Sequence, residues 1–212
     1  MSENGGNKHL DWRYAVKKFD TSKKISKTDF EALTEALRLS PSSFGLQPWK
    51  FVVVEDKNLR TRLKAHAWNQ TQVTEASHFV VLCALNSIDS AYVKNFVAKI
   101  SKTRGVPVAQ LEAYEKMMLD FVQRTPASAL SDWMKRQVYL ALGVLLDEAA
   151  RRHIDACPME GFDPKAFDEV LELPAKGLQS VVLCALGYRA SDDVYAGLAK
   201  VRFTPEEVIV RY

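Results

Sequence analysis

Apolar and polar positions divide the chain into segments of two kinds, one with helical spacing and one of short continuous apolar runs. Helical spacing is clearest after Ser26, where a hydroxyl is followed three residues later by an acid, as is typical of a helix start. Phe30, Leu33 and Leu37 then share one helical face, and the pattern ends at Pro41. Further helices are predicted over residues 57–68, 90–102, 108–122 and 164–171.

Short apolar runs predict the β-strands, at residues 51–54, 79–85, 154–157 and 180–188. The runs are apolar at consecutive positions rather than at alternate ones. Strands of this kind are buried on both faces of their sheet. We therefore expect helices to cover both faces.

The longest helical pattern covers residues 130–153 and is apolar on most of its sides. A helix of this character is buried in a core or in an interface, and the pattern alone leaves both open. Its apolar positions include Trp133, Met134, Val138, Tyr139, Leu142, Val144 and Leu145.

The last 22 residues, 191–212 and hereafter the tail, end in Val208-Ile209-Val210, a β-forming run with no later partner along the chain. One interpretation is an edge strand on the chain's own sheet. The other is an arm that pairs with a second subunit. The pattern favours neither.

Composition narrows the class of protein. At 212 residues with 47% hydrophobic positions, the chain predicts one large domain at residues 11–212 behind a disordered segment at 1–10. The formal net charge is +3, and its basic runs, such as Lys17-Lys18, are short, so a nucleic-acid-binding module is disfavoured. No apolar run reaches the roughly 20 residues of a membrane-spanning helix and no signal peptide is visible, so we expect no membrane association.

The three cysteines, Cys83, Cys157 and Cys184, fit no metal pattern, and their odd number argues against a disulfide framework. We expect buried, unreactive thiols and a reducing, cytoplasmic location. The four histidines are scattered, so no metal site is expected.

Two segments carry the candidate chemistry. Arg13-Tyr14-Ala15-Val16-Lys17 would by itself be read as a solvated face, and the helix-to-strand loop 40–49 as a polar loop without chemistry. Together they resemble the signature of the flavin-dependent nitroreductase family. The resemblance implies that Arg13 holds the phosphate of FMN and that Lys17 lies at the N1 and O2 edge of the ring. Tyr14 and Ala15 depart from a frequent His and a usual Ser.

The loop contains Gln47-Pro48-Trp49, which completes the family pattern. By the same resemblance, the part of the loop before it reaches the flavin from the partner subunit. Its residues are Pro41, Ser42, Ser43, Phe44 and Gly45.

Three further segments match the family in order and spacing. Asn69 corresponds to the Asn that reaches the pyrimidine ring, and Gln72 stands where Lys is frequent. Lys200 and Arg202 correspond to the late Lys-x-Arg pair at the phosphate. The remaining segment is Pro158-Met159-Glu160-Gly161. It resembles the family segment in which the main-chain N–H of a Glu faces flavin N5. The resemblance therefore makes Glu160 a candidate catalytic group, together with Lys17.

The resemblance extends over nearly the whole chain, and the helix at 132–140 is similar to the dimer helix of the oxygen-insensitive nitroreductase and dihydropteridine reductase subgroup. It implies an α+β fold with a mixed, mostly antiparallel sheet flanked by helices, and a homodimer whose C-terminal arms are exchanged. The implied activity is FMN-dependent oxidation of NADH or NADPH, with ping-pong hydride transfer through N5 to nitroaromatics, quinones or similar small-molecule acceptors.

Other functions stay open: another reaction on this fold, such as enone reduction, dehalogenation or flavin fragmentation, or flavin binding without turnover. The resemblance does not choose the acceptor or the nicotinamide, nor does it define the contacts of Ala15 and Gln72. Residues 92–121 are expected to carry the helices that face the acceptor.

Overall fold

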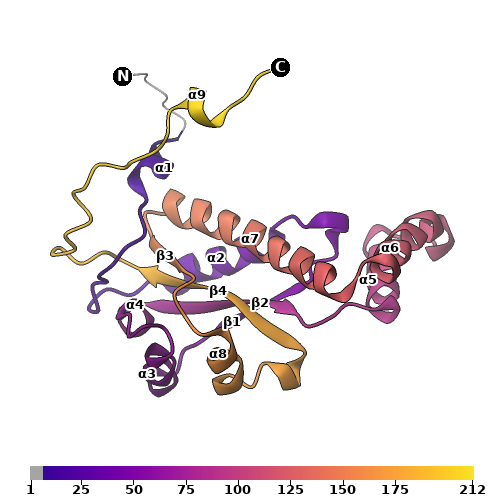
Figure 1. Ribbon diagram of the computed structural model, residues 1–212, viewed down its shortest axis with the longest axis horizontal. Coiled ribbons are helices and arrows are strands. Elements are labelled where there is room, and N and C mark those ends of the chain that lie inside the picture. The colour runs from indigo at the N-terminus through magenta and orange to yellow at the C-terminus, as the bar shows by residue number, and fades with distance from the viewer. Residues whose placement is uncertain (1–6) are drawn as a thin grey trace.

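A four-stranded sheet forms the centre of the protein, as seen in a computed structural model that describes residues 7–212 (Figure 1). The strand order is β1-β2-β4-β3, and the three pairings are antiparallel. A single parallel bridge joins Ala15 to Ala156 and makes the pairing mixed. The strands are β1 (Trp49–Val53), β2 (His78–Leu85), β3 (Asp155–Met159) and β4 (Leu178–Gly187).

The predicted strands are present, with shifted ends. The strand expected at 154–157 is β3, which continues to Met159. Pro158 and Met159, which the predicted strand does not include, are therefore its last two residues, because they still pair with Cys184 and Leu183 of β4.

Both faces of the sheet are buried, as the continuous apolar runs predict. In β2, Val80 and Leu82 pack into one core while Phe79 and Val81 pack into the other. Helices α2 (Lys27–Leu39) and α7 (Ala127–Arg151) cover the first face. The short helices α3 (Lys57–Ala65), α4 (Gln72–Glu75) and α8 (Pro164–Val170) cover the second (Figure 1).

Helix α7 has 25 residues and is the longest element, as predicted. Its buried face includes Met134, Val138 and Leu145, whereas Tyr139 and Leu140 are exposed on another side. Helices α5 (Ser90–Arg104) and α6 (Glu112–Arg124) project from one end of the molecule (Figure 1). The remaining turns of helix are η1 (Ser43–Gly45), η2 (Val108–Leu111) and η3 (Pro174–Lys176).

The N-terminal segment differs from the prediction. We expected disorder over residues 1–10; residues 1–6 lie outside the described part, but Lys8 to Leu10 belong to helix α1 (Lys8–Trp12). The helix packs against α7, and the His9 ring lies 2.7 Å from a carboxylate oxygen of Asp147. This contact between distant residues is not visible in the sequence pattern.

The tail contains a short helix, α9 (Pro205–Val208), and pairs with no strand of the described chain. The interpretation as an edge strand on the chain's own sheet is therefore wrong. Thr204 caps the helix by accepting from the main-chain N–H of Glu207, whose carboxylate accepts from the N–H of Thr204, and this local capping box takes part of the β-forming run into a helical turn. The tail rises beside α1 and ends away from the sheet (Figure 1).

Candidate functional site

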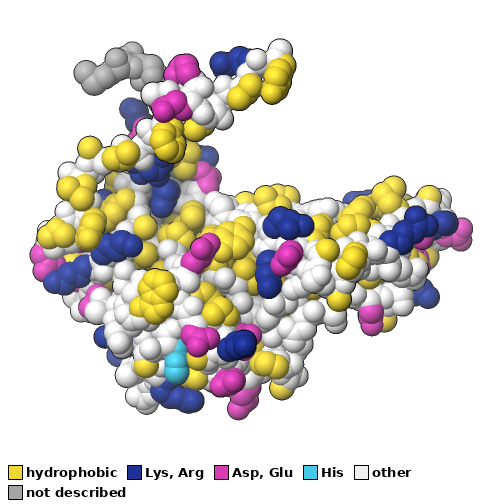
Figure 2. Space-filling view, viewed as in Figure 1, with side chains coloured by type: hydrophobic (Ala, Val, Ile, Leu, Met, Phe, Trp, Pro, Cys, Tyr) yellow, Lys and Arg dark blue, Asp and Glu magenta, His cyan; other side chains and the backbone are white. Residues whose placement is uncertain are grey.

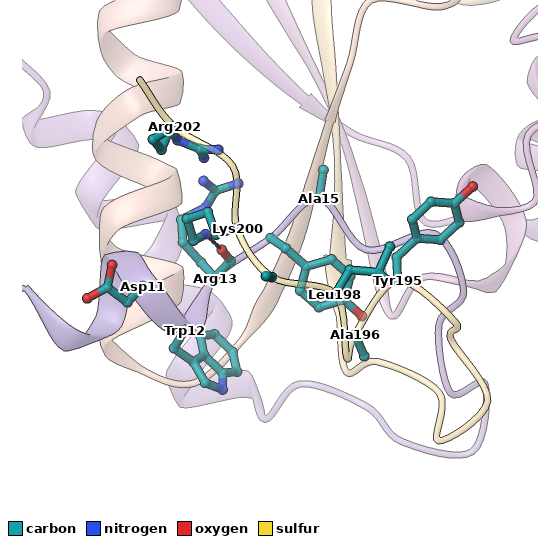
Figure 3. A pocket seen from close by; sticks show the side chains of 11 residues that line it. Asp11, Trp12, Arg13, Ala15, Tyr195, Ala196, Leu198, Lys200 and Arg202 are labelled. Carbon is teal, nitrogen blue, oxygen red and sulfur yellow. Dashed lines mark hydrogen bonds between the residues drawn. The ribbon is translucent and has the colours of Figure 1, made fainter. Parts of the chain in front are cut away.

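Three cations meet at a cavity between the N-terminal segment and the tail. The cavity has a volume of about 390 Å³, and Arg13, Lys200 and Arg202 line it together with Tyr14 and Ala15. Figure 3 shows the three basic side chains gathered at one side of it. Lys200 Nζ donates a hydrogen bond to the main-chain oxygen of Arg13, so the tail is fastened to the segment that it faces.

The charges of the cavity are poorly compensated. Burial, followed by the nearby positive charge of Arg202, lowers the pKa of Arg13. Burial and then the charges of Arg13 and Arg202 lower the pKa of Lys200. Asp11 is the acidic residue among the lining side chains. Cations held together without matching carboxylates favour binding of an anion, and a phosphate accepts charged hydrogen bonds from Arg and Lys.

Asp193 fixes the geometry on the other side of this segment. Its buried carboxylate accepts hydrogen bonds from the main-chain N–H groups of Lys17, at 2.8 Å, and Lys18, at 3.0 Å, and from the Tyr14 hydroxyl at 3.0 Å. It also accepts from the N–H of Tyr195 at 3.0 Å. Burial alone would raise the pKa of Asp193, but these hydrogen bonds hold it below its usual value. Asp193 thereby joins the first predicted flavin segment to the tail.

An ion pair supports the same region from the sheet. Arg189 donates to the buried carboxylate of Asp155 at 2.6 and 2.9 Å. The Arg189 guanidinium also lies 4.4 Å from the centre of the Trp12 ring and 4.5 Å from that of Tyr14. Charge pairing and stacking together hold the chain that leads to Arg13, and Ala15 is held by its bridge to Ala156.

The loop after β3 carries Glu160 and Gly161 and packs beside the turn that carries Asn69, the third predicted group of this region. Gln70 Nε2 donates to the main-chain oxygen of Gly161 at 2.8 Å. A Cβ atom built at Gly161 would lie 2.7 Å from the Trp68 ring, so glycine allows a close approach there. Asn69 follows Trp68, and both have positive φ angles, 55° and 52°. Glu160 and Asn69 are exposed, and Glu160 bonds to Tyr139.

Gln72 and Lys17, the two other residues predicted to face the flavin ring, differ in burial. Gln72 is 5% exposed at the start of α4 and lies beside the Cys157 thiol. Lys17 is exposed, while its main chain is held by Asp193. All three cysteines are free and buried, as predicted, and burial raises the pKa of Cys157.

The loop at 41–45 is not brought to the cationic cavity within one chain. Its Ser43 N–H donates to Gln137 of α7 at 2.9 Å, and the main-chain oxygen of Phe44 accepts from the Tyr114 hydroxyl of α6 at 2.7 Å. Ser42 Oγ accepts from the N–H of Gln47, and Phe44 has a φ of 55°. The loop, from Pro41 to Gly45, is thus fixed in a tight conformation against the α5–α7 end.

A second hollow, of about 490 Å³, lies between β1 and helices α2 and α5 and reaches Leu46 and Gln47, which follow this loop. Its lining includes Trp49, Lys50 and Phe51 of β1, with Arg38 and Lys99 from neighbouring helices. Among residues 7–212, β1 has no strand on its side away from β2. The same part of the chain has no cluster of His, Cys, Asp or Glu suited to a metal ion, and no helix in it is long and apolar enough to cross a membrane.

Sequence reasoning missed several residues that shape the site. Asp155 is a lone acid and Asp193 follows Asp192, both in segments without a motif, and their roles appear only when distant parts of the chain meet. Tyr139 was recognised as an apolar helix position, with no sign that its hydroxyl bonds to Glu160. Gln137, Tyr92 and Tyr114 hold the 41–47 loop through contacts made far along the chain.

A mostly antiparallel sheet between helical layers, with a cationic cavity at the joined chain ends, defines an α+β protein suited to a phosphate-bearing ligand. The nitroreductase family model matches residues 10–188. A protein named "Putative NAD(P)H nitroreductase", from Staphylococcus aureus (strain bovine RF122 / ET3-1), is 41% identical over 189 residues, which are 85% of this chain and 85% of that protein. The chain belongs to the nitroreductase family.

Solved structures agree on the fold. A protein from Exiguobacterium sibiricum 255-15, solved in complex with FMN, superposes with a TM-score of 0.81 at 22% identity, over 100% of this chain and 99% of that one. An enone reductase of gut-bacterial fatty acid saturation gives a TM-score of 0.80 at 20% identity, over 100% and 99% of the two chains.

Proposed function

We propose that this protein is an FMN-dependent NAD(P)H oxidoreductase that reduces nitroaromatics, quinones or similar acceptors. The observation that carries the proposal is the meeting of Arg13, Lys200 and Arg202 at one cavity in a chain of the nitroreductase family. The name of the staphylococcal relative and the FMN bound to the Exiguobacterium protein support it. The unit that acts is the single domain at 11–212, with the tail as its arm.

The residues present fit FMN at its phosphate end. A phosphate monoester needs two or three cationic donors, and the cavity offers three. Arg13, Lys200 and Arg202 would hold the phosphate, and the main chain of Tyr14 and Ala15 would face the ribityl chain. When bound, FMN supplies the redox chemistry by taking a hydride at N5 from NADH or NADPH and passing two electrons to the acceptor.

The protein's own groups orient the ring and set its potential. Lys17, whose main chain Asp193 fixes, would place a cation at the N1 and O2 edge, where negative charge develops on reduction. The Glu160 N–H would face N5 from the end of β3, with Pro158, Met159 and Gly161 shaping that wall. Asn69 would reach the pyrimidine edge, whereas Gln72 is buried beside Cys157 at the start of α4 and is assigned no contact with the ring. Nicotinamide and acceptor would occupy the same face in turn, which makes the cycle ping-pong.

The partner subunit completes this site in our proposal. The 41–45 loop is held on the α5–α7 end of its own chain, away from its own cationic cavity, so Ser42, Ser43 and Phe44 would serve the flavin of the other subunit. The protein is then a homodimer with two sites, each built from both chains. Residues 92–121, which fasten the loop through Tyr92 and Tyr114, would also face the acceptor.

The tail would join the two subunits. It carries exposed apolar side chains, among them Phe203, Ile209 and Val210. Figure 2 shows hydrophobic side chains along the tail at the top of the molecule. The hollow beside β1 offers an open strand edge, apolar surface and three cations, while the tail carries Glu206 and Glu207. In our proposal the tail of a second copy lies along that edge, where the extended residues after α9, Ile209 and Val210, would supply hydrogen bonds and apolar contact, and Glu206 and Glu207 would face the cations.

Enone reduction is the second candidate activity. The fold of the enone reductase is the observation in its favour, since the same flavin site would reduce an activated double bond instead of a nitro group. The difference between the two activities lies in the acceptor side of the site, to which the 92–121 helices contribute. We place the enzyme in the cytoplasm because its three thiols are all unpaired.

Purified protein tests the proposal directly. We expect a yellow protein with flavin absorbance, one FMN per chain, that is bleached by NADH or NADPH and recoloured by a nitroaromatic or quinone. Steady-state turnover with a panel that includes enones separates the two activities. A colourless protein that stays colourless after reconstitution with FMN would contradict the flavin function altogether, and a yellow protein inert to both nicotinamides would leave flavin binding without turnover.

A further inference from the structure

The Glu160 side chain is tied to helix α7. The Tyr139 hydroxyl, on the exposed side of that helix, donates a hydrogen bond of 2.5 Å to Glu160 Oε1. A hydroxyl that donates to a carboxylate makes a shorter and stronger bond than two neutral groups do. Burial, and then this hydrogen bond, raise the pKa of Tyr139 to about 12, so the phenol keeps its proton and stays a donor at neutral pH.

The loop that carries Glu160 is also held from the opposite side. Gln70 bonds to the Gly161 main chain, Trp68 packs on Gly161, and the Asp163 N–H donates to the main-chain oxygen of His66 at 2.8 Å. The hydrogen bond from Tyr139 holds Glu160 to α7, and α7 itself packs along the sheet. The loop is therefore held between two elements, and its end at Glu160 depends on the contact with α7.

We propose that Tyr139 is a positioning residue that acts on the flavin through Glu160. The inference rests on the proposed function, in which the Glu160 N–H faces N5. The bond to Tyr139 holds the carboxylate against α7, offsets part of its charge and fixes the direction of the main chain beside it. Without the hydroxyl, an uncompensated negative charge would be free to move next to a ring that gains negative charge on reduction, which disfavours the reduced cofactor.

The midpoint potential of the bound flavin tests this role without relying on turnover. Tyr139→Phe keeps the ring and removes the donor. We expect it to weaken binding of reduced FMN relative to oxidised FMN threefold to tenfold, where tenfold lowers a two-electron potential by about 30 mV. Tyr188→Phe is the matched control, because it removes a phenol hydroxyl that lies outside this loop, and its potential should equal that of the wild type.

A double-mutant cycle separates action through Glu160 from packing by the tyrosine ring. In a Glu160→Ala background, Tyr139→Phe should produce no further change in potential, because its partner is gone. The contact itself is checked in the FMN-free protein by ultraviolet titration of the phenols. Glu160→Gln should lower the pKa of Tyr139 toward the ordinary value, and the Tyr139→Phe protein identifies which titration step belongs to it.

The outcomes for this inference and for the proposed function are distinct. A wild-type protein that binds no FMN overturns both. A wild-type protein that binds FMN and oxidises NAD(P)H, with a Tyr139→Phe variant at the wild-type potential, overturns the positioning role alone. The same potential shift in the wild-type and Glu160→Ala backgrounds overturns it as well, since Tyr139 would then act by another route.

Discussion

Residues 7–190 bury apolar side chains on both faces of one sheet, whereas the tail leaves its own exposed. Phe79 and Leu82 in the sheet are 0% exposed, but Val201 is 84% and Phe203 is 74% exposed. Burial of apolar surface is the dominant favourable term in folding and in most association. A tail of this composition therefore gains little from its own chain, and its apolar side chains are suited to a second one.

The cationic cavity lies where these two regions meet. Arg13 comes from the buried region, while Lys200 and Arg202 come from the tail. Cofactor binding would then depend on how firmly the tail is held, by Asp193 within the chain and by a partner beyond it. The first three of the four changes below test this dependence and the fourth tests the ring end of the site, in order of decreasing expected effect.

Deletion of residues 205–212 should have the largest effect. It leaves Lys200 and Arg202 in place but removes most of the segment that would pair with the second subunit. We expect a dimer that dissociates on dilution and a large loss of FMN affinity. The thermal midpoint should depend on protein concentration in the full-length protein, and the deletion should shift that dependence to higher concentrations, because dimerisation is linked to folding.

Size measurement across a dilution series gives the decisive comparison for the deletion. A truncated protein that stays as tightly dimeric as the full chain, with FMN affinity unchanged, would refute arm exchange. The exposed apolar side chains of the tail would then have no role in holding the dimer together.

Asp193→Ala should have the next largest effect, because it removes the hydrogen bonds that hold the tail to the N-terminal segment of the same chain. It removes the acceptor of three donors in and next to the first flavin segment, those of Tyr14, Lys17 and Lys18, and of the Tyr195 N–H in the tail. Each donor left unpaired costs about 1–3 kcal/mol where it stays buried, and less where water replaces the carboxylate. We expect a lower denaturant midpoint and FMN binding weakened by at least about tenfold, measured by urea unfolding and fluorescence titration.

The pH dependence of stability gives a control for Asp193. Its pKa is lowered in the folded protein, so the stabilisation is present above the unfolded value, near 3.9, and is lost as pH falls through the folded value. Asp193→Asn keeps the size and one acceptor but has no charge to titrate. The stability difference between wild type and Asp193→Asn should therefore shrink in acid; a constant difference from pH 7 to pH 3 would argue against the ionised acceptor.

Sequence patterns predicted the buried region well because its cause is local. Consecutive apolar residues in 79–85 require cover on two faces, and the spacing of Leu33 and Leu37 gives α2 its buried side. At the tail the pattern left two interpretations open, and the intrachain edge strand is wrong, because a capping box at Thr204 and Glu207 draws the start of the β-forming run into a helical turn. Within one chain the tail lies beside α1 and pairs with neither edge strand of the sheet, so the preference of its residues for strand is not satisfied there.

The candidate site was predictable only in part. Resemblance pointed to Arg13, Lys200 and Arg202, and the structure brings these three to one cavity. Asp193 and Tyr139 were not predictable, because each acts through a contact between residues distant along the chain, and neither the acidic pair Asp192-Asp193 nor a Tyr within a helix carries a local signal of it. Such residues are found only once the fold has brought the segments together.

Arg202→Ala should weaken FMN binding by roughly tenfold or more, since a charged hydrogen bond to phosphate contributes about 1.5–3 kcal/mol and about 1.4 kcal/mol is a factor of ten. Fluorescence titration measures the dissociation constant, and activity should return in excess FMN. Arg62→Ala is the matched control, since it removes the same charge from an exposed position of α3, outside both the cavity and the tail. Equal affinities for the wild type and Arg202→Ala would remove Arg202 from the site.

Lys17→Met should have the smallest effect, because it changes the cofactor's potential rather than its binding. The substitution keeps the length of the side chain and removes the charge that would favour the reduced ring at its N1 edge. The midpoint potential should fall by tens of millivolts, at about 30 mV per 1.4 kcal/mol for a two-electron couple. Lys18→Met is the matched control, because the Lys18 side chain pairs with Asp192 on the surface. If both variants bind FMN and the bound FMN keeps the wild-type potential, Lys17 is a surface residue like Lys18. The proposed contacts of residues 7–190 with the flavin ring would then come from Glu160 and its loop.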